Sequence, residues 1–375
     1  MARSSLTPLR LGFIGGAVTS AIGYTHFNSS RLDGHFRVDS GCFSRTASRN
    51  QETARTYGIP PGRTHATWHD LLAREKETLD AVVVLTPTPD HREIVTASLE
   101  AGYAVICEKA LALSSADCRA IDDAVTRRRG FLAVTYNYSG YPMVRELRRL
   151  IADGELGCLH QIHIEMPQEG FLRRAASPQA WRLQDYGVPT ISLDLGVHVH
   201  HLVHFLTGGK RPLSVVGDQS TYGQFPEIVD NVYCLAHYED KLRIQSWYGK
   251  TALGYRNGLR IRVFGSQASA EWLQTEPEDL RLSHADGRHV LIDRGCADAD
   301  VARQVRYNRF KPGHPSGFIE AFANLYADIA DHLRRHQAQQ AGSDSFVYGA
   351  RESEEGLRFL EAISRSSRAR QWENI

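Results

Sequence analysis

The chain has 375 residues, too many for one ordinary hydrophobic core, so two domains are expected. Its 42% hydrophobic and 23% charged residues are typical of a globular protein. With 44 basic and 43 acidic residues, the formal net charge of +1 excludes an overall field that would recruit nucleic acid or an anionic membrane. No run of about 18 apolar residues is present to span a bilayer.

The cysteines and the N-terminus indicate a cytoplasmic protein. No CxxC spacing occurs, which favours reduced thiols over a disulfide framework or a zinc site. Residues 1–10 form a short polar leader without the apolar core of a signal peptide. The six scattered cysteines are Cys42, Cys107, Cys118, Cys158, Cys234 and Cys296.

The first part of the chain alternates between short apolar runs and helical patterns. Strands are predicted at residues 9–14, 35–43, 81–85, 104–107 and 131–135, and helices at 47–57, 90–101 and 114–128. The run at 81–85 is apolar at every position, as in a strand buried on both faces of a parallel sheet. This alternation predicts a doubly wound parallel sheet in a first domain, residues 1–138.

The pattern changes in residues 139–375, which we assign to a second domain. The predicted strands are 159–165, 231–238, 242–248 and 259–264, and the predicted helices are 141–152, 194–206, 318–334 and 352–365. Residues 337–345 are polar and predict a surface loop. Strands with few intervening helices indicate an α+β domain with an open, mainly antiparallel sheet.

A glycine turn follows the first predicted strand. Gly15 and Gly16 would let backbone amides and a helix N-terminus approach a pyrophosphate, as in a dinucleotide-binding domain. Ala17 stands where the second fingerprint glycine is expected, and the stretch to Gly23 is longer than the standard spacing. A tight turn without a ligand is the alternative.

Two further segments follow predicted parallel strands. The loop from Thr86 to His91 is placed to line a cofactor, because ligands lie at the carboxyl ends of such strands. Its alternative role is to cap the helix that follows. Lys109, in Cys107-Glu108-Lys109-Ala110, can hold a substrate hydroxyl and stabilise developing negative charge. A surface Glu-Lys pair is the alternative there.

Asp194 and His198 are four residues apart in a predicted helix, which places a carboxylate and an imidazole on one helix face. Such a pair can move a proton, and histidine titrates near physiological pH. A local hydrogen bond or a solvated helix face would produce the same pattern.

Taken in order, these segments resemble the glucose-fructose oxidoreductase / inositol dehydrogenase / rhizopine catabolism (Gfo/Idh/MocA) family. The resemblance extends to residues 136–145, 154–157, 313–315 and 318–326. It implies a Rossmann domain, an α/β domain with an open, mainly antiparallel sheet, and NAD(P)-dependent oxidation or reduction of sugars and cyclitols. The chain departs from the family at Ala110, where proline is usual, and this change removes no reacting group.

The resemblance implies that Lys109, Asp194 and His198 are catalytic. His198 would remove the hydroxyl proton, Lys109 would stabilise alkoxide character, and Asp194 would orient the lysine or histidine. The implied cofactor-binding residues are Gly15, Gly16, Ala17, Ile22, Ser44, Arg45, Thr86, Pro87, His91, Glu108, Lys109 and Asn137. The implied substrate-binding residues are Lys109, Tyr138, Gln168, Trp181, Arg182, Asp194, His198 and His314.

Some of these assignments have structural alternatives. Trp181 could belong to the core, and Arg182 could close an internal salt bridge. No metal is expected, although His200 and His204 have a spacing that could hold one. Ser44 and Arg45 at the end of the second strand favour a 2′-phosphate and hence NADP slightly. An arginine can also lie over the adenine of NAD, so both cofactors stay open.

Two other functions stay open as well: a glycosidase that uses NAD for transient oxidation and elimination, and a dinucleotide-binding sensor without catalysis. The resemblance also implies the partners, a sugar or cyclitol substrate and other copies of the chain as a dimer or tetramer, since the open sheet face needs cover.

Overall fold

The computed structural model describes residues 7–173, 176–340 and 346–375. The chain divides into two compact units, Met1–Gly140 with Phe318–Glu354, and Tyr141–Gly317 with Glu355–Ile375. The predicted polar leader at 1–10 and the predicted loop at 337–345 lie largely outside the described residues.

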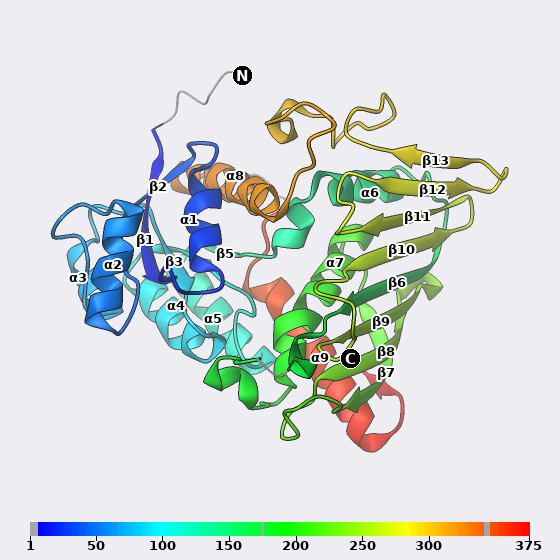
Figure 1. Cartoon of the computed structure of the whole chain (residues 1–375), viewed down its shortest axis with the longest axis horizontal. Helices are drawn as coiled ribbons and strands as arrows, with labels where there is room; N and C mark the ends of the chain where they lie inside the picture. The colour runs from blue at the N-terminus through cyan, green and yellow to red at the C-terminus, as the bar shows by residue number, and fades with distance from the viewer. Residues whose placement is uncertain (1–6, 174–175, 341–345) are drawn as a thin grey trace. The chain divides into compact units, whose positions relative to one another are not determined.

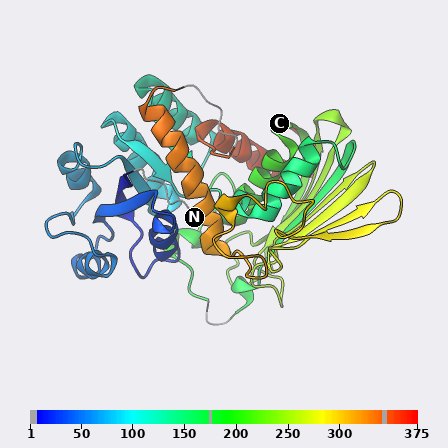
Figure 2. The same ribbon diagram turned by 90° about the horizontal axis from the view of Figure 1, so that it is seen from above.

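A parallel sheet forms the centre of the first unit (Figures 1 and 2). Its strand order is β2-β1-β3-β4-β5, and all four neighbouring pairs are parallel, as predicted. Every residue of β3 is buried, which explains its uninterrupted apolar sequence. The strands are β1 (Leu9–Gly15), β2 (Phe36–Cys42), β3 (Ala81–Leu85), β4 (Ala104–Cys107) and β5 (Leu132–Val134).

Helices connect these strands, and local capping defines several of their ends. The side chain of Ser114 accepts a hydrogen bond from the Asp117 amide before α5, and Thr67 does the same for Asp70 before α3. Gly58 adopts the left-handed conformation that ends α2. The helices are α1 (Gly23–Arg31), α2 (Ala47–Tyr57), α3 (Trp68–Arg74), α4 (His91–Glu100), α5 (Ser115–Arg128), and the 3-10 turns η1 (Thr88–Asp90) and η2 (Asn137–Gly140).

Helix α8 (Phe318–Gln337) packs in the first unit although it comes late in the sequence. Phe322, Tyr326 and Ile329 join the same buried cluster as Phe36 of β2. A Cβ atom on Gly140 would lie 2.0 Å from the Ala321 carbonyl oxygen, so only glycine fits at that approach. The sequence-based division at 138/139 places α8 in the second domain. The structure differs because the apolar face of α8 completes the first core.

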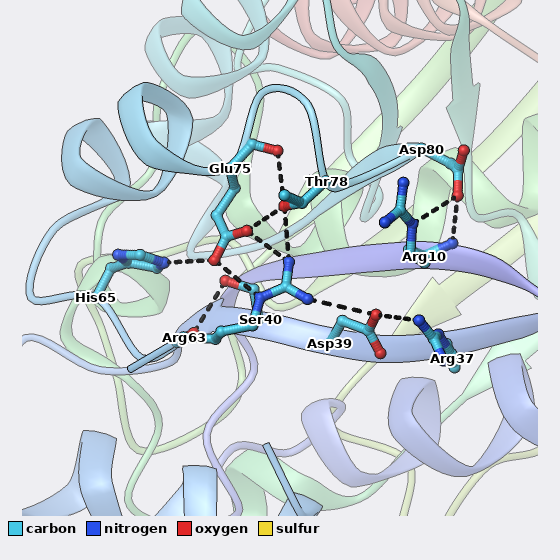
Figure 3. A network of polar contacts seen from close by, with 9 residues as sticks. All are labelled: Arg10, Arg37, Asp39, Ser40, Arg63, His65, Glu75, Thr78 and Asp80. Atoms are coloured by element: carbon cyan, nitrogen blue, oxygen red, sulfur yellow. Dashed lines mark hydrogen bonds and ion pairs between the residues drawn. The ribbon is translucent and has the colours of Figure 1, made fainter. Parts of the chain in front are cut away.

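A buried polar network secures the edge of the parallel sheet (Figure 3). The Glu75 carboxylate accepts hydrogen bonds from Arg63 at 2.5 Å and from Thr78, and contacts His65 Nε2 at 3.0 Å. Thr64 forms an isolated parallel bridge with Gly41 of β2, which extends the sheet edge. Burial by itself raises the pKa of Glu75, but the hydrogen bonds from Arg63, Thr78 and His65 lower it to about 2.

The second unit contains a nine-stranded sheet of order β13-β12-β11-β10-β6-β9-β8-β7-β14. Among its pairs, β6 and β9 are parallel and the others are antiparallel, which confirms the predicted mainly antiparallel sheet. The strands are β6 (Leu159–Pro167), β7 (Pro212–Ser220), β8 (Asn231–Tyr238), β9 (Arg243–Gly249), β10 (Arg260–Gly265), β11 (Ala268–Leu273), β12 (Leu280–His284), β13 (His289–Ile292) and β14 (Glu373–Asn374).

Helices of this unit lie on one face of its sheet (Figures 1 and 2). They are α6 (Pro142–Ala152), α7 (Val197–Thr207) and the later part of α9 (Ala350–Ala369). The shorter helical turns of the unit are η3 (Gly170–Leu172), η4 (Ala180–Leu183), η5 (Ser192–Gly196), η6 (Glu239–Lys241) between β8 and β9, and η7 (Val305–Tyr307). No helix within the described ranges has the length and apolar character needed to cross a membrane.

Candidate active site

The glycine turn at the end of β1 is pressed against the end of β3. Gly15 and Gly16 have φ values of +83° and +74°, which side-chain-bearing residues rarely adopt. A Cβ atom on Gly16 would lie 2.5 Å from Leu85 Cδ1. Helix α1 begins only at Gly23, and its N-cap residue, Ile22, makes no side-chain capping bond. The long spacing between the glycines is therefore accommodated by extra turns before the helix.

Two buried polar atoms indicate that the carboxyl ends of the parallel strands fit a dinucleotide. Thr86 follows β3, and Asn137 begins η2 after β5. The Thr86 Oγ1 and Asn137 Nδ2 atoms are buried and have no hydrogen-bond partner among the described residues. Because buried polar groups normally have partners, these atoms are suited to polar groups of a bound nucleotide.

At the end of β2, Ser44 and Arg45 already have partners in the chain. The Ser44 hydroxyl accepts a hydrogen bond from the Thr46 amide at 3.1 Å. The Arg45 guanidinium lies 3.0 Å from the Asp90 carboxylate at the end of η1, and its side chain is 90% exposed. The segment 42–45 contains no carboxylate that would bind the ribose hydroxyls of NAD.

Glu108, which follows β4, is held inside the first unit. Its Oε1 atom lies 3.1 Å from His26 Nε2 and accepts a hydrogen bond from the Thr135 hydroxyl. Burial by itself raises the pKa of Glu108, but the hydrogen bond and charge of His26, with smaller contributions from Lys109 and Thr135, lower it below its ordinary value. Its carboxylate is thus committed to protein groups, whereas the family resemblance implies a cofactor contact.

His91 lies between two of the predicted cofactor loops. Its Nδ1 atom is 2.8 Å from the Ala110 carbonyl oxygen and its Nε2 atom is 2.8 Å from the Thr86 carbonyl oxygen. Burial lowers the pKa of His91, although both carbonyl contacts act in the opposite direction. The ring therefore joins the loops after β3 and β4.

Lys109 stands at the carboxyl end of β4 with part of its surface exposed. The residues on either side of it, Glu108 and Ala110, are buried. Among residues 107–112 this lysine is the one side chain with a substantial exposed part. It is the residue that the sequence predicts to hold a substrate hydroxyl.

In the second unit, Asp194 lies between two cations. Its Oδ2 atom is 2.5 Å from Lys250 Nζ and 2.6 Å from the Arg182 guanidinium. Arg182 therefore forms the internal salt bridge that was its alternative role. Lys250 follows β9 and was not found from the sequence, because only strand pairing reveals which strand end approaches Asp194. Two cations therefore contact one oxygen of this carboxylate.

The helix predicted at 194–206 begins differently in the structure. Asp194 lies in the π-helical turn η5, and the α-helix α7 begins at Val197. Ser192 Oγ lies 2.9 Å from the Tyr248 hydroxyl, and a Cβ atom on Gly196 would lie 2.9 Å from that same hydroxyl. The π-helical turn η5 is therefore packed closely against Tyr248 of β9. The prediction of a single α-helical face for Asp194 and His198 is corrected, since π-turns, frequent at functional sites, have a different period.

His198, His200 and His201 are buried in α7, and His204 is partly exposed. His198 is 4% exposed. His200 and His204 both approach the Glu355 carboxylate, at 3.7 and 3.2 Å. Burial lowers the pKa of His200 to about 4. In the described part of the chain, no group of three or more histidine, cysteine or acidic side chains could hold a metal ion.

The other predicted substrate residues occupy varied positions. The Gln168 amide donates to Asn257 Oδ1 at 3.0 Å. The Trp181 ring has the Arg182 guanidinium carbon 4.5 Å from its centroid, so these neighbours stack on each other. His314 is exposed. Tyr138, in the first unit, is 5% exposed and is packed near Phe318.

Comparisons with known proteins agree with these features. Residues 9–136 match the family model described as "Oxidoreductase family, NAD-binding Rossmann fold", and residues 144–271 match the "GFO/IDH/MocA C-terminal domain". The chain is 28% identical to the uncharacterized oxidoreductase YfiI of Bacillus subtilis, with 96% of this chain and 95% of that protein covered.

Solved structures give the same answer. An inositol dehydrogenase homolog from Azotobacter vinelandii, complexed with NAD+, is 27% identical with a TM-score of 0.92, and 98% of each chain is covered. The same homolog with NADH and myo-inositol gives a TM-score of 0.89 at 27% identity and the same coverage. Matches to both domain models, together with this likeness over nearly the whole length, show that the chain belongs to the Gfo/Idh/MocA family of NAD-binding oxidoreductases.

Proposed function

We propose that the protein is an NAD(P)-dependent dehydrogenase that acts on a secondary hydroxyl or ketone of a sugar, sugar derivative or cyclitol. The observation that carries this proposal is the partly exposed Lys109 at the carboxyl end of β4, in the same domain as the glycine turn. The likeness to an inositol dehydrogenase homolog supports the substrate class.

The residues carry different parts of the reaction. A bound nicotinamide supplies the acceptor for the hydride that leaves the carbinol carbon. His198 removes the hydroxyl proton as general base. Lys109 donates a hydrogen bond to a substrate oxygen and stabilises its negative charge as the carbon–oxygen double bond forms. In the reverse direction His198 returns the proton.

Asp194 has an orienting role in this proposal. Lys250 and Arg182 both form ion pairs with its carboxylate. It fixes these cations and balances part of their charge. The positive charges of Lys250 and Arg182 favour a substrate oxygen that becomes negative during oxidation.

For the cofactor, NADP is favoured slightly over NAD. No carboxylate is present at residues 42–45 to bind the ribose hydroxyls, and Ser44 and Arg45 offer a hydroxyl and a guanidinium to a 2′-phosphate. Arg45 would have to exchange its contact with Asp90 for the phosphate. The NAD+ complex of the related inositol dehydrogenase homolog keeps NAD as the other candidate.

The test is a screen of purified protein against sugars and inositols, with NAD and NADP separately, followed by nicotinamide absorbance. Net formation of NADH or NADPH with a free polyol is expected. A glycosidase that regenerates its cofactor in each cycle would release sugar without net reduction, and a sensor would bind dinucleotide without turnover. Absence of a response in both directions, with every polyol and both cofactors, contradicts the proposal.

Variants then assign the roles. Lys109→Met and His198→Asn should each lower kcat by on the order of 100-fold or more, because each removes a group that acts on the reacting oxygen. The control is Lys76→Met, at an exposed lysine after α3, which should keep wild-type turnover. Full activity of both site variants on the screened substrate would show that other residues carry the reaction.

A further inference from the structure

Two buried histidines that take no part in the proposed chemistry contact the two neighbours of Lys109. His26 of α1 binds Glu108, and His91 at the start of α4 binds Ala110. Both imidazoles have essentially no exposed surface. Such buried polar side chains are retained at a cost in desolvation, so their contacts call for an explanation.

Glu108 is held by His26 and by further contacts from other elements. The two ring nitrogens of His26 lie 3.1 Å from Glu108 Oε1 and 2.7 Å from the Tyr326 hydroxyl of α8. Thr135, after β5, donates to the same Glu108 oxygen. The Glu108 amide also donates to the Val84 carbonyl of β3 at 2.9 Å. Side chain and backbone of the residue before Lys109 are therefore both anchored.

The His91 contact fixes the residue after Lys109. Its ring lies 2.8 Å from the carbonyl oxygens of both Ala110 and Thr86. Ala110 and the two residues that follow it are buried, each 1% exposed. The two neighbours of Lys109 are thus held by side chains from α1 and α4, Glu108 through its carboxylate and Ala110 through its backbone carbonyl.

We propose that His26 and His91 are positioning residues that act on Lys109 through Glu108 and Ala110. This inference rests on the proposed function of Lys109. A displacement of about 1 Å at a reacting group can lower turnover by roughly 100-fold. His26 and His91 hold the two neighbours of the lysine, and we therefore expect them to affect kcat without contacting the substrate.

The experiment on His26 compares three variants. His26→Leu removes the donor to Glu108, and His26→Gln replaces it with an amide near the position of Nε2. His65→Leu is the matched control, because His65 is also buried in the first unit and contacts a carboxylate, Glu75 Oε1, at 3.0 Å (Figure 3). For each variant, the experiment measures the thermal midpoint of unfolding, the Kd of the reduced cofactor, kcat and KM.

We expect His26→Leu to lower kcat by roughly tenfold or more, His26→Gln to recover most of that loss, and His65→Leu to keep wild-type kcat at a similar loss of stability. Equal kcat in all three folded variants, or equal losses in His26→Leu and His65→Leu, would overturn the positioning role. If His26→Leu does not fold, Thr135→Val removes the second donor to the same Glu108 oxygen and is judged by the same criteria.

Two substitutions that replace the imidazole with an amide test the part of the proposal that concerns His91. The amide nitrogen of His91→Asn falls near the position of Nδ1 and faces Ala110, whereas that of His91→Gln falls near Nε2 and faces Thr86. Because Ala110 adjoins Lys109, His91→Asn should retain roughly threefold more turnover than His91→Gln. The reverse order, or equal turnover, contradicts this half of the proposal.

A readout without turnover separates this proposal from the proposed function. The chain has only six lysines, so mass spectrometry can compare competitive amine labelling of Lys109 with that of Lys311. The Lys109 to Lys311 ratio should change roughly threefold or more in His26→Leu and return toward wild type in His26→Gln. An unchanged ratio in both overturns the positioning role, even if wild-type protein oxidises polyols. A changed ratio supports it, even if no polyol reacts and the dehydrogenase proposal fails.

Discussion

At the scale of single residues, Lys250 is the group that changes the interpretation of Asp194. From the sequence, Asp194 is one half of an acid-base pair with His198. In the structure, Lys250 and Arg182 both bind its Oδ2 atom. An i, i+4 spacing contains no information about a strand end 56 residues further along the chain, so this part of the site could not be predicted.

Lys250→Met should therefore impair catalysis through Asp194. Removing this cation takes an ion-pair partner from a mostly buried carboxylate, and we expect kcat/KM for the polyol to fall by roughly tenfold. Steady-state kinetics provide the measurement. The matched control is Lys210→Met, which removes a surface ion pair with Asp240 and should change kcat/KM and stability little. Equal effects in the two variants would show that Lys250 has no special role.

Glu75 is a second single residue with a testable effect, on how the free energy of unfolding depends on pH. Its pKa is lowered from 4.5 to about 2, so the carboxylate stabilises the folded state fully above about pH 5, and this contribution is lost as the pH falls toward 2. Glu75→Gln should lower the free energy of unfolding by about 3 kcal/mol at pH 7. Urea unfolding at pH 7 and pH 3 provides the measurement. The loss should be smaller at pH 3, and a constant difference would contradict the assigned cause.

At the scale of elements, the sequence predicts the parallel strands well because each buried strand is a short apolar run. The predicted strands at 81–85 and 104–107 coincide with β3 and β4. The sequence does not predict β7, in which Gly217 interrupts a mixed pattern. Nor does it predict β12 and β13, which are only five and four residues long. Such strands depend on pairing with their neighbours.

The π-turn η5 also depends on a neighbouring element. Its Gly196 faces Tyr248 of β9 and Leu360 of α9, and a Cβ atom would lie 2.9 Å from both. Gly196→Ala should lower the free energy of unfolding by about 1–3 kcal/mol through overpacking, and reduce kcat because Asp194 shifts with the turn. Thermal unfolding and kinetics on the same preparation provide the measurement.

Gly187→Ala is the control for that change. No heavy atom lies within 4 Å of a Cβ built on Gly187, and its φ is not positive. This substitution should leave both stability and kcat near the wild-type values. If the two alanine variants behave alike, tight packing of η5 does not position Asp194.

At the scale of the whole molecule, the sheet of the second unit leaves apolar side chains exposed. Tyr233 and Leu235 of β8 are 46% and 50% exposed, and the Trp247 ring of β9 stacks near Tyr233 with centroids 5.8 Å apart. Exposed apolar clusters on a sheet favour burial against another chain. We therefore expect a homo-oligomer that uses this face.

Leu235→Lys should weaken that assembly, because it places a charge within the apolar cluster. Light scattering coupled to size exclusion, over a range of protein concentrations, measures the mass. Leu253→Lys is the control, since Leu253 is 73% exposed and lies in the loop after β9. A monomeric wild-type protein, or equal masses for the two variants, would contradict the use of this face.

The packing of α8 affects how the protein can be synthesised and dissected. Tyr326 of α8 supplies the hydroxyl beside His26, and its neighbours on α8 fill the core of the first unit. A ribosome must translate more than 330 residues before this helix can dock on the strands made first. An expressed fragment that stops near residue 138 would therefore present an uncovered apolar surface, whereas a fusion that rejoins residues 318–354 to it restores the missing helix.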